Sequence, residues 1–167
     1  MIREAVISDD QKYRYTLYRE WAEEVDKEVF GVRVLNFVML NPSKADGKVD
    51  DPTVRKCIGF AQRNGYNAIR IVNLFAFRAT DPKELKKAYD SGEDVAGPDN
   101  NEYVRELPPD ETVVVAWGAT FMKEDFVRKR VWGTLKMLDR KLYCLSKTKD
   151  GHPGHPVMLG YGPLVEF

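Results

Sequence analysis

Four apolar runs, each ended by a polar loop, constrain the fold of this chain more than any other feature. The runs lie at residues 32–40, 68–75, 112–117 and 142–145, and amphipathic segments separate them. The third run contains Val113-Val114-Val115-Ala116, which is apolar on both faces, as a central strand of a parallel sheet requires. Strands that alternate with helical crossovers of this length predict a parallel sheet with right-handed connections.

The segments between the runs carry signals for the start of a helix. Asp51 and Pro52 predict an N-cap and a first helical residue, and apolar residues then recur at helical spacing from Val54. The sequence Asp81-Pro82-Lys83-Glu84 repeats this signal as a capping box. A further helix is expected from about Lys123, so a helix follows each of the first three runs.

Residues 13–18 alternate aromatic or apolar side chains with polar ones, which is the pattern of a half-exposed strand. We expect this strand at an edge of the sheet. The predicted class is a three-layer α/β/α sandwich, with a mainly parallel central sheet of about four strands plus this N-terminal edge strand. Since no repeat or low-complexity linker divides the sequence, we expect residues 1–167 to form a single domain.

The composition argues against several classes of protein. No apolar run approaches the ~18 residues that a membrane span needs, and the N-terminus lacks the features of a secretory signal. We therefore expect a cytoplasmic protein that has no membrane contact. The chain has two cysteines and two histidines, too few for the common structural metal sites, so we predict neither a metal nor a cofactor. Its formal net charge is zero, so no global field would draw it to nucleic acid.

The carboxyl ends of parallel strands meet at one edge of a sheet, where open α/β sheets bind ligands. We therefore predict a functional site at the loops that follow the four runs, with three catalytic candidates. Asn41 can orient a water or a substrate carbonyl, but its amide cannot accept a proton. His155 can donate to a developing anion, and Asp46 could act as a general base or hold magnesium.

Other residues of these loops are predicted to bind the substrate. The Arg78 guanidinium and the Lys147 ammonium could hold phosphate, and Trp117 or Phe75 could stack on a flat ring. The complete predicted binding set is Pro42, Ser43, Asn73, Phe75, Arg78, Thr80, Trp117, Gly118, Lys147 and His152.

Each of these interpretations has an ordinary structural alternative. Asn41 could cap its own Asn-Pro turn, Trp117 could be a core residue, and Asp46 could serve only to solvate a loop. Ser43 could be a nucleophile, but no G-x-S-x-G elbow surrounds it. The absence of G-x-x-x-x-G-K-[ST] and of G-x-G-x-x-G argues against a P-loop enzyme and a dinucleotide-binding protein.

With these motifs, the chain resembles the bacterial and phage family catalogued as domain of unknown function 1643. The resemblance covers nearly the whole chain, and its most specific part is the motif that runs from Asn73 to Pro82. The other matching segments are Leu40-Asn41-Pro42-Ser43, Asp51-Pro52-Thr53, Gly97-Pro98, Ala116-Trp117-Gly118 and His155-Pro156. This family name implies no activity.

The order of the motifs is also similar, more remotely, to that of the uracil-DNA glycosylase superfamily, particularly its mismatch-specific branch. Asn41-Pro42 resembles the motif whose Asn positions the attacking water, and Asn73-Leu74 with Arg78-Ala79-Thr80 resembles a second conserved segment of that branch. His155-Pro156 resembles the His-Pro-Ser motif whose histidine stabilises the departing base. Met39 and Val157 depart from the glycine and serine of those motifs. The resemblance implies a uracil-DNA-glycosylase-like fold and a nucleobase or nucleotide ligand.

The leading functional hypothesis is an enzyme that acts on a nucleobase, a nucleotide or a DNA base, with cleavage or exchange of an N-glycosidic bond as the expected reaction. Asn41 would orient water or substrate, and His155 would stabilise the leaving group. One alternative is a binding module for nucleotides or nucleic acid that has no catalytic activity. Another is a hydrolase of small substrates that uses Ser43 or a metal. The sequence predicts no oligomeric state.

Overall fold

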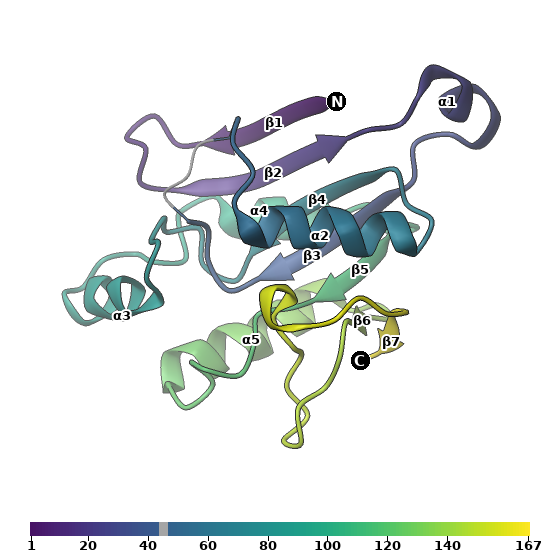
Figure 1. Cartoon of the computed structure of the whole chain (residues 1–167). Helices are drawn as coiled ribbons and strands as arrows, with labels where there is room; N and C mark the ends of the chain where they lie inside the picture. Colours follow the sequence, from purple (N-terminus) through teal and green to yellow (C-terminus); the bar gives the residue numbers. More distant parts are fainter. Residues whose placement is uncertain (44–46) are drawn as a thin grey trace.

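The computed structural model describes residues 1–43 and 47–167, and these residues form one seven-stranded sheet (Figure 1). Its strands lie in the order β1-β2-β4-β3-β5-β6-β7. The neighbours β4, β3, β5 and β6 pair in parallel, whereas β1, β2 and β7 pair antiparallel. The bounds are β1 (Ile2–Ile7), β2 (Arg14–Glu20), β3 (Val34–Met39), β4 (Ala68–Asn73), β5 (Thr112–Val115), β6 (Tyr143–Cys144) and β7 (Val165–Glu166). The predicted mixed α/β fold with a mostly parallel central sheet is confirmed.

Helices pack on both faces of this sheet. The described residues contain α1 (Glu24–Phe30), α2 (Pro52–Arg63), α3 (Pro82–Asp90), α4 (Asn100–Arg105), α5 (Asp125–Leu138) and the 3-10 turn η1 (Pro156–Met158). In β3, Phe37 packs in one core cluster with residues of α2, and the next residue, Val38, packs in a second cluster with residues of α3, α4 and α5. This alternation is the two-residue period of a strand that is buried on both sides. In the described part of the chain, no helix has the length and apolar character needed to cross a membrane.

The predicted helix starts are confirmed at α2 and α3. Asp51 accepts a hydrogen bond from the Val54 N–H at 2.8 Å, and Asp81 accepts one from the Lys83 N–H at 2.9 Å. Pro52 and Pro82 are the first helical residues, where a missing N–H costs nothing. Each cap also fixes where the preceding loop must end, so these local signals help to position the loops at the sheet edge.

The predicted edge position of the strand at residues 13–18 is wrong. This strand is β2, and it pairs with β1 on one side and with β4 on the other. The alternating sequence pattern indicated an exposed face, but three charged residues of β2, Arg14, Arg19 and Glu20, are buried in the folded chain. β1 was not predicted, since most of its side chains are exposed and give a weak apolar signal.

Residues 155–164 form a segment, here called the C-terminal strap, that lies beside α2 (Figure 1). The Lys56 ammonium donates to the Leu159 carbonyl at 2.6 Å, and the Asn64 amide donates to the Gly162 carbonyl at 3.1 Å. Between these two anchors, the Tyr161 ring lies against Gly59. The cationic groups of Lys56 and Arg63 lie 4.3 and 3.8 Å from the Tyr161 ring centroid. The strap thus fixes the position of the loop that carries His155.

Replacing Gly59 with alanine tests this packing. A Cβ at Gly59 would lie 2.5 Å from the Tyr161 hydroxyl and 2.7 Å from two ring carbons, so Tyr161 must move. Gly133 of α5 is the matched control, because nothing lies within 4 Å of a Cβ there. We expect Gly133→Ala to raise the free energy of unfolding by about 0.5–1 kcal/mol, as a helix-interior alanine does, and Gly59→Ala to give no such gain. Urea denaturation measures both variants, and equal gains would contradict the packing of Tyr161 on Gly59.

Candidate functional site

A cavity of about 530 Å³ lies at the carboxyl ends of the parallel strands. All four predicted loops contribute to its lining: Asn41 follows β3, Thr80 follows β4, Trp117 follows β5 and His155 follows β6. The volume falls within the range of ~300–1,000 Å³ typical of small-molecule sites. The convergence expected from parallel strand order is therefore present as a cavity of ligand size.

Seven predicted site residues line the cavity, although their functional roles remain predictions. They are Asn41, Ser43, Asn73, Thr80, Trp117, Gly118 and His155. Asp46, the third predicted catalytic residue, lies outside the described residues. In the described part of the chain, no group of three or more His, Cys, Asp and Glu side chains is arranged to hold a metal ion.

Two predicted residues of the loop after β4 lie away from the cavity lining. Phe75 is buried in the core, where its ring centroid lies 5.4 Å from that of Phe126. Arg78 donates to the Gln11 carbonyl at 2.9 Å and lines a separate surface pocket that also contains Lys12. Neither residue is therefore part of the cavity wall. Stacking of a ligand on Phe75, or binding of phosphate by Arg78, would have to occur outside this cavity.

Three more predicted residues have structural contacts outside the lining. Pro42 is buried, and its carbonyl accepts hydrogen bonds from the Asn41 amide and from the Ala79 N–H. The Lys147 ammonium lies 5.8 Å from the Phe167 ring centroid. The His152 N–H donates to the Thr148 hydroxyl at 3.1 Å. Of the two histidines, only His155 lines the cavity.

Asn41 joins the loop that follows β3 to the loop that follows β4. Its Nδ2 donates to the Ala79 carbonyl at 2.9 Å and to the Pro42 carbonyl at 3.1 Å. Because both partners are acceptors, the orientation of the amide is fixed by the network. The amide hydrogens are occupied, so the group that Asn41 can offer to a ligand or a water is its acceptor oxygen, Oδ1.

Asn73 and Trp117 bring polar groups to the cavity. Asn73 is 2% exposed, and its side chain lines the cavity. The buried indole N–H of Trp117 has no hydrogen-bond partner within the described residues. Buried polar groups are nearly always paired in folded proteins, so this unpaired donor at the cavity points to a ligand that would satisfy it.

His155 is held as a neutral hydrogen-bond donor. Its Nδ1 accepts from the Val157 N–H at 3.4 Å, which places the ring proton on Nε2. Burial lowers the pKa of His155 below its ordinary value, and the nearby Asp51 carboxylate opposes that shift. Gly118 packs closely against this residue, since a Cβ at Gly118 would lie 3.3 Å from the His155 Cβ and the glycine has a φ of 78°.

Ser43 and Asp51 form a pair at the cavity wall. The Ser43 hydroxyl donates to Asp51 Oδ2 at 3.0 Å, while Asp51 Oδ1 caps α2. Both carboxylate oxygens of Asp51 are therefore engaged, and the partner of Ser43 is a carboxylate instead of an imidazole. The Asp51 carboxylate that accepts from Ser43 is shared with the α2 cap, and this pair differs from the Ser–His arrangement of a typical serine nucleophile.

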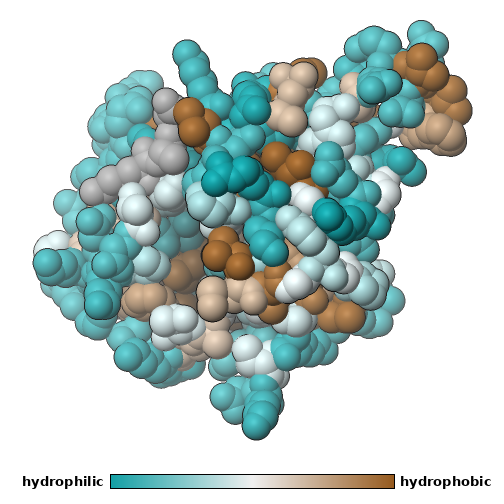
Figure 2. Space-filling model, in the orientation of Figure 1, coloured by the Kyte–Doolittle hydropathy of each residue, from teal (hydrophilic) through white to brown (hydrophobic). Residues whose placement is uncertain are grey.

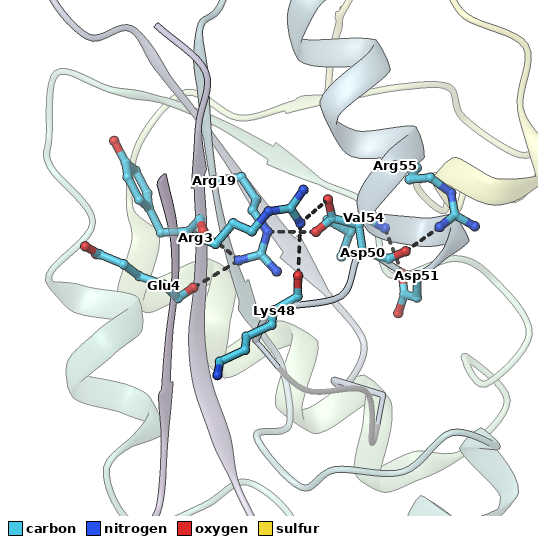
Figure 3. A network of polar contacts seen from close by, with 9 residues as sticks. Arg3, Glu4, Arg19, Lys48, Asp50, Asp51, Val54 and Arg55 are labelled. Carbon is cyan, nitrogen blue, oxygen red and sulfur yellow. Dashed lines mark hydrogen bonds and ion pairs between the residues drawn. The ribbon is translucent and has the colours of Figure 1, made fainter. Parts of the chain in front are cut away.

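Asp50 anchors the end of the loop between β3 and α2 to strands β1 and β2 (Figure 3). Its Oδ1 accepts from Arg19 Nε and its Oδ2 accepts from Arg3 Nη1, both at 2.7 Å. The Arg19 side chain is fully buried, and its Nη1 also donates to the Tyr18 carbonyl at 2.8 Å. These contacts give Asp50 a structural role.

Arg14 is a cavity-lining residue that the sequence did not indicate. It is 4% exposed, and burial lowers its pKa to about 10, opposed by the nearby Asp51 carboxylate. It is therefore still a cation at pH 7. Among the described lining residues, Arg14 and Lys83 are basic, and Asp51 and Asp81 are acidic. The described part of the lining therefore carries equal numbers of each sign and favours no strongly charged ligand.

The state of His155 predicts how stability depends on pH. Because its pKa is lower in the folded chain than its ordinary 6.5, the unfolded chain binds more protons just below pH 6.5, and stability must fall as the pH is lowered through that range. We expect His155→Gln to flatten this part of the curve of unfolding free energy against pH. The control variant Gln62→Ala, which removes no titrating group, should keep the slope of the parent. An unchanged slope in His155→Gln would show that His155 is not held in its neutral form.

Comparisons with known proteins identify a family for this chain. A family model described as "Protein of unknown function (DUF1643)" matches residues 14–157, which is more than half of the sequence and contains every residue predicted for the site. A search of the curated proteins and a search of the solved structures found no match. The family resemblance drawn from the motifs is thus confirmed, and the chain belongs to the DUF1643 family.

Proposed function

We propose that the cavity binds a nucleobase, either free, in a nucleotide, or extruded from DNA, and that the protein acts on its N-glycosidic bond. The observation that carries this proposal is the buried indole N–H of Trp117, which has no partner within the described residues and lines the same cavity as Asn73. Leaving a buried donor or acceptor unpaired costs about 1–3 kcal/mol, so a ligand that pairs with the indole recovers that free energy.

The chemistry of the lining fits a flat heterocycle with a polar edge. A carboxamide such as that of Asn73 presents one acceptor and two donors side by side, and it can pair bidentately with the edge of a base. Apolar side chains, including Leu40, Ile71 and Phe121, supply the walls against which a ring would pack. The balanced lining charges also suit a ring system that is neutral at pH 7.

The proposed reaction assigns distinct roles to Asn41 and His155. Asn41 Oδ1 would orient a water molecule toward the anomeric carbon of the sugar. As the C–N bond breaks, its electron pair leaves with the base, and the neutral His155 would donate a hydrogen bond from Nε2 to the developing anion. The water oxygen forms the new bond to the anomeric carbon, and its proton is released to solvent.

The resemblance to uracil-DNA glycosylases supports this proposal in one respect. It predicts a common site for Asn41, Asn73 and His155, and these three residues line one cavity. Helices on both faces of a largely parallel sheet are also compatible with the three-layer architecture of that superfamily. We include the glycosylase-like architecture in the proposal for these reasons.

A second candidate function is binding without catalysis. One observation favours it: both oxygens of Asp51 are engaged by Ser43 and Val54, and Asp81 caps α3. With both oxygens engaged, the Asp51 carboxylate is not free to deprotonate a water. A protein that senses or sequesters a nucleotide would need the Asn73 contact but no base.

Binding and turnover measurements on alanine variants separate the two functions. We expect a panel of nucleobases and nucleoside monophosphates to contain a ligand that, at ~100 times its Kd, raises the free energy of unfolding by about 2.7 kcal/mol. Asn73→Ala should weaken its binding at least about tenfold by removing the paired amide. Asn41→Ala should retain binding but lose release of free base from nucleosides or oligonucleotides.

The exposed amide Gln62 provides the control, and Gln62→Ala should behave like the parent in both assays. Binding without base release in the parent would select the non-catalytic function. If no member of the panel stabilised the parent, or if Asn73→Ala bound as tightly as the parent, the nucleobase proposal would be wrong.

A further inference from the structure

Helix α1 presents apolar side chains that do not pack in the core. The helix has no buried residue, and it projects from the body of the molecule (Figure 1). Val25, Val29 and Phe30 are 69%, 63% and 64% exposed, and Val32 just beyond the helix is also exposed. Figure 2 shows apolar surface over this projection, beside hydrophilic side chains. A contiguous apolar patch of this kind is typical of an interaction site.

The base of this projection is anchored to the sheet. Asn67 is buried, its Oδ1 accepts from the Arg33 N–H at 2.6 Å, and its Nδ2 donates to the Gly31 carbonyl at 3.1 Å. On the other side, the Lys27 ammonium pairs with Glu20 of β2 at 2.9 Å. A helix of this length is marginal by itself, so these anchors account for its order. We call residues 23–33 the α1 platform.

The apolar residues of the α1 platform lie among acidic ones. Glu23, Asp26 and Glu28 are exposed and form no ion pair with any residue of the described chain. Of the two basic residues, Lys27 is paired with Glu20 and Glu24, and the Arg33 guanidinium lies 5.7 Å from the Phe30 ring centroid. The platform therefore combines an apolar centre with an excess of negative charge.

We propose that the α1 platform is a docking surface for a protein segment that is both apolar and basic, such as a basic amphipathic helix. Charge complementarity is the basis of this choice. A second copy docked through the same surface would bring acidic residues together, and an anionic membrane would repel them. The inference concerns residues outside the cavity lining, so it is independent of the proposed function.

The test uses two labelled synthetic peptides with the same helical pattern of leucines, one with lysines and the other with glutamates at the polar positions. Fluorescence anisotropy with the full chain should show binding of the lysine peptide, and at least about tenfold weaker binding of the glutamate peptide. Phe30→Ser and Asp26→Lys should each weaken binding of the lysine peptide. Higher salt should also weaken it, as expected for exposed charges.

Trp132 of α5 is the matched control, because it is 63% exposed like Phe30 but lies beside Lys136 on a basic helix. Trp132→Ser should bind the lysine peptide as the parent does, and circular dichroism should show that every variant is folded. Equal binding of both peptides, no binding of either, or unchanged binding by Phe30→Ser would overturn the proposal. The proposal would also be overturned if sedimentation showed a dimer that Phe30→Ser abolishes. Binding of the parent to phosphatidylglycerol vesicles that is lost in Phe30→Ser would overturn it as well.

Discussion

Parallel pairing of β3 with β4 on one side and β5 on the other is the constraint on which the cavity depends. Val38 is level with Val72 of β4 and with Val115 of β5, so the three strands end together at one edge. Asn41, Asn73 and Trp117 emerge within a few residues of this common level. A shift of one residue in either register would turn the side chains of a strand to the opposite face.

The loops beyond that edge are held by specific polar contacts as well as by packing. Asp50 joins the first loop to β1 and β2 through Arg3 and Arg19, and the Arg19 side chain is fully buried. Removing one partner of a buried ion pair commonly costs about 3–5 kcal/mol, because the other charge remains buried. Asn41 then ties this loop to the carbonyl of Ala79 in the next one. These loop contacts are satisfied, which makes the buried indole N–H of Trp117, unpartnered within the described residues, stand out.

The features predicted correctly from the sequence are those set by local chemistry. Asp51 and Asp81 cap the helices that they were expected to cap, and the apolar runs form the four parallel strands. Features that depend on distant partners were missed. β1 and α1 bury too few side chains to give a periodic apolar signal, and the burial of Arg14 depends on the strands around it.

The same distinction explains which site residues reached the cavity. Asn73 is the last residue of β4, so its place at the sheet edge follows from the strand itself. Arg78 lies five residues further along the loop, and its direction is set by a hydrogen bond to Gln11, a contact that the sequence pattern does not reveal. Spacing along the chain was sufficient to place the loops, but it could not orient every side chain within them.

The central claim is that Asn73 and Trp117 await a base-like ligand in one cavity, and side-chain NMR tests it most directly. The chain has three tryptophans, Trp21, Trp117 and Trp132, so their indole N–H signals provide internal controls in a ¹H–¹⁵N spectrum. On titration with nucleobases and nucleoside monophosphates, we predict that the Trp117 indole and Asn73 amide signals shift together with a single Kd. The other two indole signals should remain in place. Shifts confined to Trp21 or Trp132, or no shift of Trp117 with any member of the panel, would contradict the account.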